Sequence, residues 1–311
     1  MNVLLTGAFE YSNDQIKLFS DLGFKIYFVQ DERVALGEQQ LNFRIDEIEY
    51  VVCNSLFLYN DITCFKSLKF IQLTSAGTDR IPFDYIEQQN ITLFNAKDVY
   101  SIPIAEWVLL KTLEFYKQAH FFYESQKNKI WNKNRNLLEL TGKSAAIIGF
   151  GSVGNEIAKR LSSFGVEVIA VNKHNKATSS NIKEAYLVSD LEKVLKMSDI
   201  IILSLPYTKQ NHHIIDNKML SLMKANSVLV NVSRGGIIDE NALVKQLDSG
   251  RFLGVALDVF EEEPLPNSNP LWECKRVSVT PHNSFVSDKV KDRLFNIILD
   301  NLREYVLKGN S

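Results

Sequence analysis

The chain has 311 residues, of which 45% are hydrophobic and 23% charged, and its formal net charge at pH 7 is -2. This length is enough for about two domains that each bury a core. The balanced charge argues against a dedicated nucleic-acid surface, and no apolar run reaches the membrane-spanning length of about 20 residues. We therefore expect a soluble globular protein that binds neither nucleic acid nor membrane.

The start of the chain, Met1–Thr6, lacks the basic and small-residue features of a signal peptide and instead predicts a first strand. The cysteines Cys53, Cys64 and Cys274 are odd in number and lack the C-x-x-C spacing of metal sites. These features predict a cytoplasmic protein with reduced thiols, no disulfide framework and no bound metal.

Short apolar runs alternate with longer amphipathic stretches along the chain, a pattern typical of βαβ units around parallel sheets. The first third contains five predicted strands: Val3–Thr6, Lys25–Val29, Tyr50–Cys53, Phe70–Leu73 and Thr92–Phe94. Apolar residues at helical spacing then predict a long helix from Ile102 to Gln126.

A second set of βαβ units begins at Ser144. Its predicted strands are Ala145–Gly149, Glu167–Val171, Ile200–Ser204, Ser227–Asn231, Leu253–Leu257 and Val277–Val279. Helices fit between the strands, for instance over Val153–Phe164 and Glu240–Leu247. The last amphipathic helix, Ser287–Leu307, has no strand of its own, so we expect it to return to the first domain. The order predicts an α/β fold of two doubly wound parallel-sheet domains with a cleft between them.

A glycine-rich turn follows the strand that ends near Ile148, and a predicted helix follows the turn. In this turn Gly149 allows a tight bend, Gly151 lets the backbone approach a pyrophosphate, and Gly154 lets the helix pack against the strand. The helix N-terminus then presents free N–H groups to the anion. A flexible turn is the alternative, but the position between strand and helix favours a dinucleotide site.

The end of the following strand bears on the choice of cofactor. An acidic residue there would bind the adenosine ribose, but this strand ends in Asn172, followed by Lys173 and, further on, Lys176. A carboxylate would repel a 2′-phosphate, whereas Asn172 and the lysines would attract one. We therefore predict that NADPH is favoured over NADH. The alternative is a solvated basic loop in which Asn172 binds an unmodified ribose.

Three further motifs lie just beyond predicted strands of the second domain: Asn231–Gly236, Asp258–Pro264 and Thr280–Asn283. The carboxyl edge of an open α/β sheet is where ligands bind. An arginine offers a fork of donors to a carboxylate, and a histidine paired with a glutamate supplies a proton to a developing alkoxide. Each motif alone would be unremarkable, but in this order after a glycine turn they indicate reduction of a 2-oxo acid.

With these motifs the chain resembles the D-isomer-specific 2-hydroxyacid dehydrogenase family, most clearly from Leu140 to Ser284. The resemblance implies that Arg234 binds substrate, Glu263 pairs with the acid and His282 donates the proton. Of three adjacent glutamates, Glu263 is chosen because it directly precedes Pro264, as in the family. The resemblance also implies a Rossmann nucleotide-binding domain over residues 99–285. A flavodoxin-like substrate domain would then comprise residues 1–98 and 286–311.

The resemblance implies further contacts. Cofactor contacts are expected from Ser152 and Val153 over the pyrophosphate, Leu205 and Pro206 at a strand end, Val232 and Ser233 near the nicotinamide, and Asp258 at the carboxamide. The loop containing Ser75, Ala76 and Gly77 resembles the family's substrate-carboxylate loop, in which backbone N–H groups bind the anion. A homodimer is also implied, with the helix from Ile102 contributing.

Several alternatives stay open. Glyoxylate, hydroxypyruvate, a branched 2-oxo acid and a phosphorylated hydroxy acid are not separated, although Phe57, Leu58 and Tyr59 favour an uncharged substrate side chain. A non-enzymatic nucleotide sensor or protein-binding module would use the same fold, but the complete arginine, glutamate and histidine set argues against it. An amino-acid dehydrogenase would carry a catalytic lysine, for which no motif is found. The lack of a regulatory domain after residue 311 makes a feedback-regulated enzyme the less expected form.

Overall fold

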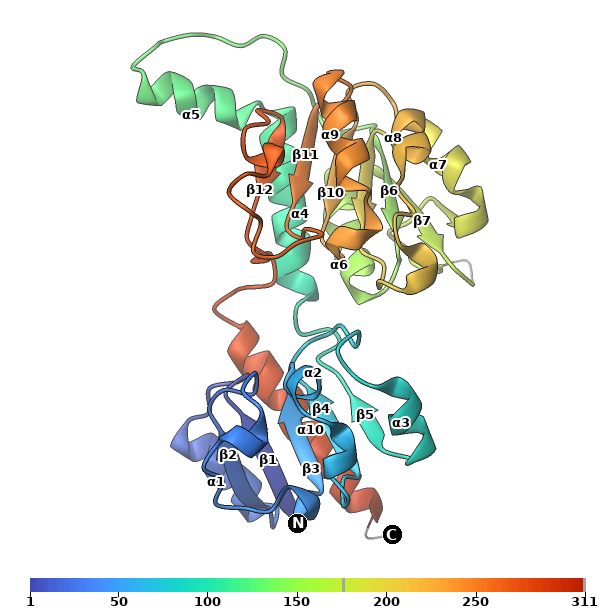
Figure 1. Ribbon diagram of the computed structural model, residues 1–311. Coiled ribbons are helices and arrows are strands. Elements are labelled where there is room, and N and C mark those ends of the chain that lie inside the picture. The colour runs from blue at the N-terminus through green and yellow to red at the C-terminus, as the bar shows by residue number, and fades with distance from the viewer. Residues whose placement is uncertain (175–176, 310–311) are drawn as a thin grey trace. The chain divides into compact units, whose positions relative to one another are not determined.

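The computed structural model describes residues 1–174 and 177–309 and divides into two compact units (Figure 1). The first unit comprises Met1–Tyr100 with the segment from Ser287 onward, and the second comprises Ser101–Val286. None of the described helices is both long enough and apolar enough to cross a membrane.

The first unit is built on a five-stranded sheet of order β2-β1-β3-β4-β5, in which every pairing is parallel. Its strands are β1 (Asn2–Thr6), β2 (Lys25–Val29), β3 (Tyr50–Cys53), β4 (Phe70–Leu73) and β5 (Thr92–Phe94). Its helices are α1 (Asn13–Asp21), α2 (Leu56–Tyr59), α3 (Phe83–Gln88) and α10 (Val290–Gly309).

Successive side chains of each strand point to opposite faces of the sheet, and both faces are covered. Val3 and Leu5 pack with residues of α1 and α10, whereas Leu4 packs with α3 and the loops on the other face. The C-terminal helix α10 therefore completes the core of the N-terminal sheet, as Figure 1 shows.

The second unit contains a seven-stranded parallel sheet of order β12-β11-β10-β9-β6-β7-β8. Its strands are β6 (Ser144–Ile148), β7 (Glu167–Asn172), β8 (Glu184–Leu187), β9 (Ile200–Leu203), β10 (Val228–Asn231), β11 (Gly254–Leu257) and β12 (Val277–Val279). Its helices are α4 (Ser101–Tyr116), α5 (Ala119–Lys127), α6 (Ser152–Ser163), α7 (Leu191–Met197), α8 (Asn217–Leu222) and α9 (Glu240–Asp248). The chain reverses its direction across the sheet between β6 and β9, so their carboxyl ends flank the position where a dinucleotide binds in this topology.

The core of the second unit lies on both faces of this sheet. Helices α4 and α6 cover one face, where Ile147 and Ile202 are fully buried. Helices α7, α8 and α9 cover the other, where Ile148 and Leu203 are fully buried. The inner strands β9, β10 and β11 are buried along their whole length and are almost entirely apolar, because both of their faces are covered.

The predicted fold class, two parallel α/β domains, is confirmed, with two differences in the elements. The helix expected over 102–126 is two helices, because Gln118 adopts a left-handed φ of 52° and turns the chain between α4 and α5. The edge strand β8 was not predicted from the sequence, because its apolar run is only three residues long and partly buried, and Glu184 is exposed.

Candidate active site

The glycine turn after β6 has a different constraint at each glycine. Gly149 has a φ of +93°, and a Cβ there would lie 2.4 Å from the Cα of Leu205. A Cβ on Gly154 would lie 2.9 Å from the carbonyl oxygen of Gly149, so this residue allows α6 to approach the turn. A Cβ on Gly151 would meet no atom within 4 Å. The first and third glycines are therefore required by the fold, whereas the second faces open space.

The start of α6 fits the pyrophosphate of a dinucleotide. The backbone N–H groups of Ser152 and Val153 donate to no acceptor within the described chain, and no side chain caps the helix at Gly151. Unpaired N–H groups at a helix N-terminus attract an anion, and a glycine without a Cβ lets it come close. The cradle thus suits a nicotinamide dinucleotide.

Asn172 has a structural use that its sequence position did not reveal. Its Oδ1 accepts a hydrogen bond from the Phe150 N–H at 2.8 Å, and its Nδ2 lies 3.4 Å from the Phe150 oxygen. The side chain therefore braces the glycine turn against the end of β7. Lys173 is exposed, and Lys176 lies outside the described residues.

The catalytic pair predicted from the sequence is in direct contact. His282 Nδ1 lies 2.9 Å from Glu263 Oε2, while Glu263 Oε1 accepts a hydrogen bond from the Phe260 N–H at 3.0 Å. The glutamate is thus held by its own loop and in turn orients the imidazole. With Nδ1 facing the carboxylate, the ring presents Nε2 as the atom available to a substrate.

Two opposing effects set the protonation of Glu263. Burial raises the pKa of its carboxyl group, but the hydrogen bonds from His282 and Phe260 and the charges of His282 and Arg234 outweigh burial, so the pKa lies below the usual value. Glu263 is therefore a carboxylate at neutral pH. A carboxylate that faces Nδ1 fixes the orientation of the imidazole, as a proton donor in a defined position requires.

The backbone at His282 is strained. Its φ is 50°, which few residues other than glycine adopt, and its N–H points to the carbonyl oxygens of Asp258 and Thr280 at 2.8 and 2.9 Å. Such conformations persist where surrounding contacts impose them, and they concentrate at functional sites. Here the strain orients the histidine toward Glu263.

Asp258 supplies the contacts that fix this loop. It is 1% exposed, and Oδ1 accepts hydrogen bonds from the Thr280 hydroxyl at 2.6 Å and from the N–H groups of Asn283 and Ser284 at 2.8 and 3.1 Å. Its Oδ2 lies 3.0 Å from the Ser284 N–H. Asp258 therefore anchors the segment that carries His282, and its contact with a nicotinamide carboxamide stays a prediction. The part played by Thr280 was not foreseen from the sequence.

Arg234 lies in a loop that approaches the Glu263 loop closely. Its Nη1 donates to the Ser233 carbonyl at 2.8 Å, and the Asn231 amide donates to the Arg234 carbonyl at 3.1 Å. A Cβ at the next residue, Gly235, would lie 1.8 Å from the Phe260 carbonyl carbon, so only glycine fits between the loops. The anchoring role of Asn231, whose Oδ1 also accepts from the buried Ser233, was likewise missed.

The three adjacent glutamates are distinguishable. Glu261 Oε1 lies 3.0 Å from His213 Nε2 and accepts from the Glu240 N–H at 3.0 Å, so it ties two other loops together. Of these three glutamates, Glu263 is the one that contacts His282. No cluster of metal-binding side chains occurs in the described parts of the chain.

In the first unit, the loop after β4 has its carbonyl groups occupied and its amides open. The carbonyl of Ser75 accepts from the Ala96 N–H at 2.9 Å, that of Ala76 from the Asn95 amide at 2.8 Å, and that of Gly77 from the Ser75 hydroxyl at 2.8 Å. The N–H groups of Ala76 and Gly77 donate to no residue that the structure describes. The loop is thus suited to an anion such as a carboxylate.

The structure therefore places the predicted residues of the second unit at the carboxyl edge of one sheet. This edge carries Gly149, Gly151, Ser152, Val153, Gly154, Asn172, Lys173, Leu205, Pro206, Val232, Ser233, Arg234, Asp258, Glu263 and His282. Leu205 is buried beneath the glycine turn, whereas Pro206 is exposed. Ser75, Ala76 and Gly77 belong to the other unit.

Comparisons with known proteins give a consistent result. Residues 109–284 match the family described as D-isomer specific 2-hydroxyacid dehydrogenase, NAD binding domain. A D-3-phosphoglycerate dehydrogenase from Methanocaldococcus jannaschii is 31% identical over 301 residues, which are 95% of this chain but only 56% of that protein. A glyoxylate reductase from Thermococcus litoralis is 34% identical over 243 residues, covering 76% of this chain and 73% of that one. A crystal structure of a glyoxylate reductase from Paecilomyes thermophila has a TM-score of 0.84 and 26% identity, covering 99% of this chain and 96% of that one.

Proposed function

The chain belongs to the D-isomer-specific 2-hydroxyacid dehydrogenase family, and we propose that it reduces a small 2-oxo acid to the D-2-hydroxy acid with a nicotinamide cofactor. The observation that carries this proposal is the 2.9 Å contact between His282 and Glu263, on the sheet edge that also bears the glycine turn. The names of the relatives, glyoxylate reductase and D-3-phosphoglycerate dehydrogenase, support it.

The residues of the chain have distinct roles in the proposed reaction. A bound nicotinamide would supply a hydride to C2 of the substrate. Arg234 binds the substrate through its guanidinium donors, and its positive charge stabilises the negative charge that develops on the keto oxygen. His282 gives its Nε2 proton to that oxygen, while Glu263 holds the ring in position.

We propose further that NADPH is preferred. None of positions 172–174 carries a carboxylate, and Lys173, directly after β7, is exposed. A ribose 2′-phosphate would therefore meet a cation instead of a repelling anion. Because the Asn172 side chain already braces the turn, the attraction is assigned chiefly to the lysine charge.

We propose that the enzyme is a cytoplasmic homodimer. Helix α5 and the segment after it extend from the rest of their unit (Figure 1) and expose Trp131, Tyr123 and Ile130 by 96, 61 and 56%. Such a group of apolar side chains is typical of an interface. Trp107, in contrast, packs against the core of the second unit. The three cysteines are free, which agrees with a reducing compartment.

The proposed activity is tested by following the loss of reduced-cofactor absorbance with purified protein. NADPH and NADH are each combined with glyoxylate, hydroxypyruvate, pyruvate, branched 2-oxo acids and a phosphorylated 2-oxo acid. Turnover with at least one acid, faster with NADPH, is the expected result. Cofactor binding without turnover on any 2-oxo acid, phosphorylated ones included, would favour a nucleotide sensor.

A further inference from the structure

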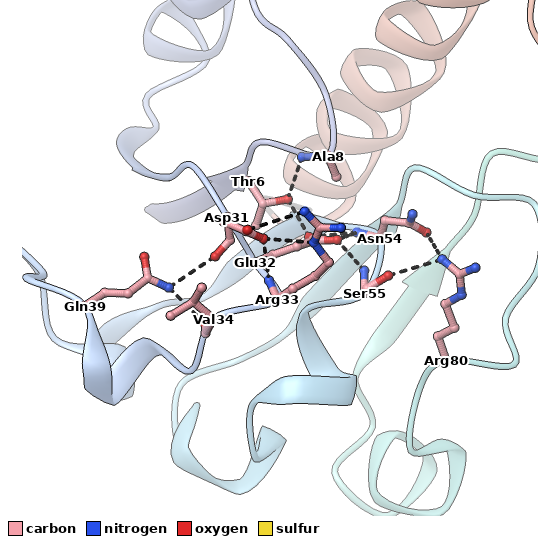
Figure 2. A network of polar contacts seen from close by, with 10 residues as sticks. All are labelled: Thr6, Ala8, Asp31, Glu32, Arg33, Val34, Gln39, Asn54, Ser55 and Arg80. Atoms are coloured by element: carbon pink, nitrogen blue, oxygen red, sulfur yellow. Dashed lines mark hydrogen bonds and ion pairs between the residues drawn. The ribbon is translucent and has the colours of Figure 1, made fainter. Parts of the chain in front are cut away.

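A polar network lies at the carboxyl edge of the five-stranded sheet, where β1 and β3 adjoin (Figure 2). From these two central strands the chain continues outward in opposite directions, to β2 on one side and to β4 and β5 on the other. This reversal point is where ligands bind in open α/β sheets.

Glu32 is the centre of the network. It is 6% exposed, and its carboxyl oxygens accept hydrogen bonds from the Thr6 hydroxyl at 2.7 Å, the Asn54 N–H at 3.0 Å and the Ser55 N–H at 2.5 Å. All of these donors are neutral. Glu32 therefore fixes the backbone after β3, and it forms no ion pair with Arg80.

Arg80 lies beside this anchored segment, in the loop after β4. Its Nη1 donates to Asn54 Oδ1 at 3.3 Å and to Ser55 Oγ at 3.2 Å (Figure 2). The side chain is half-buried, and no carboxylate of the described residues forms an ion pair with it. A partly desolvated cation without a counter-ion attracts an anion more strongly than a fully solvated one does.

The hydrogen bonds leave this cluster rich in donors. The oxygen atoms of Asn54 and Ser55 are directed to Arg80, so the Asn54 amide and the Ser55 hydroxyl keep their hydrogens for another partner. Neither these groups nor the Nε and Nη2 groups of Arg80 donate to an acceptor in the described chain. Three donor groups, one of them charged, match an oxyanion.

We propose that Arg80, with Asn54 and Ser55, binds a second anionic group at the far end of the substrate. The preferred substrates would then be 2-oxo acids that carry a carboxylate or a phosphate on the side chain. This inference rests on the proposed function, because it takes the open amides of Ala76 and Gly77 as the site of the 2-oxo acid carboxylate.

The spacing within the loop agrees with a short dianionic substrate. Gly77 and Arg80 are three residues apart, so their Cα atoms are separated by at most about 10 Å. An acid of four or five carbons, or a phosphorylated three-carbon acid, has two charged ends at a compatible separation.

The apolar residues after Asn54 do not exclude a substrate with a charged side chain. Phe57 packs in the core of the first unit, with its ring 5.5 Å from that of Phe65, and Leu58 and Tyr59 are 57 and 48% exposed. In the sequence these residues favour an uncharged substrate side chain. We instead expect a substrate with a negatively charged side chain.

The inference is tested with substrates matched in length. We expect the wild-type kcat/KM for 2-oxoglutarate or 3-phosphohydroxypyruvate to exceed that for 2-oxopentanoate by about 100-fold. The two dianions distinguish a carboxylate site from a phosphate site. The variant Arg80→Gln should lose about 100-fold on the preferred dianion and less than about threefold on 2-oxopentanoate, which also shows that it is folded.

Two further variants sharpen the result. Arg80→Lys keeps the charge and should retain more dianion activity than Arg80→Gln. Arg33→Gln is the matched control, because Arg33 lies in the same region but is exposed and paired with Asp31 at 3.1 Å. It should leave both activities unchanged.

The outcomes separate the two proposals. Equal activity on dianions and 2-oxopentanoate, or an Arg80→Gln variant that loses both equally, would overturn the role of Arg80 and leave the dehydrogenase assignment standing. Absence of turnover on every 2-oxo acid would overturn the proposed function and this inference with it.

Discussion

His282 is the residue on which the proposed chemistry depends most. Its contact with Glu263 is maintained from both sides, since Asp258 fixes the backbone of one loop and the Phe260 N–H fixes the carboxylate of the other. The geometry therefore exists before a ligand binds, and little reorganisation is needed to reach a proton-donating arrangement.

The variant His282→Gln should lower kcat by a factor of about 10³, because glutamine keeps the polar contact with Glu263 but cannot supply a proton. The dissociation constant of the reduced cofactor, measured by fluorescence titration, should change by less than about twofold. His120→Gln, at an exposed position in α5, is the control. Near-normal turnover by His282→Gln would assign the acid to another group.

Replacing the amide nitrogen of Asn172 by an oxygen, as in Asn172→Asp, is expected to change the cofactor preference. In Asn172→Asp the acceptor for the Phe150 N–H remains, so the glycine turn should stay intact. The new negative charge should repel the 2′-phosphate and shift the ratio of kcat/KM from NADPH toward NADH by about tenfold or more. An unchanged ratio, measured with both cofactors at saturating 2-oxo acid, would show that this position does not read the ribose.

The residue types of the site were predictable from the sequence, but not all of their contacts were. Arg234, Glu263 and His282 stand out because their chemistry is unusual at strand ends. For Asp258 and Asn172 the sequence predicts cofactor contacts, which stay predictions, and the structure adds hydrogen bonds from both side chains to backbone groups of other loops. Which way such a side chain points depends on neighbours distant in the chain, and a single sequence does not contain that information.

At the scale of elements, the glycines between β6 and α6 fall into two groups: some are required for folding, and one is free to serve cofactor binding. Gly149 and Gly154 are required by close backbone contacts, whereas Gly151 faces open space. Similar residues in one motif therefore have different consequences when they are changed.

Gly151→Ala should fold normally and lose affinity for the cofactor by about tenfold or more, because its methyl group occupies the space assigned to the pyrophosphate. Gly149→Ala should lower the midpoint of thermal unfolding, because a Cβ at a φ of +93° meets Leu205. Calorimetry and cofactor titration of both variants provide the comparison. Equal stability losses in the two would contradict the separation.

The elements themselves were predictable where an apolar run determined them. Strands such as β3 and β9 are fully buried, so their sequences are continuously hydrophobic. The break between α4 and α5 was not predictable, because no glycine or proline marks the left-handed residue Gln118. The return of α10 to the first sheet was inferred from its lack of a strand partner.

At the scale of the whole molecule, the exposed apolar segment formed by α5 and the residues after it predicts that two chains associate. Trp131→Glu should reduce the mass measured by light scattering from that of two chains to that of one, because a charge replaces the most exposed large apolar side chain of the segment. Phe164→Glu, at an apolar position of similar kind that is 43% exposed outside this segment, should leave the mass unchanged. A wild-type protein that is monomeric at assay concentration would contradict the dimer.

The most direct test of the central claim is the identity of the product formed from a 2-oxo acid and a reduced cofactor deuterated at the transferring position of the nicotinamide. Chiral chromatography coupled to mass spectrometry gives both the configuration and the isotope content. The proposed function predicts a single D-2-hydroxy acid with one deuterium at C2. An L or racemic product, or a D product without deuterium, would contradict it.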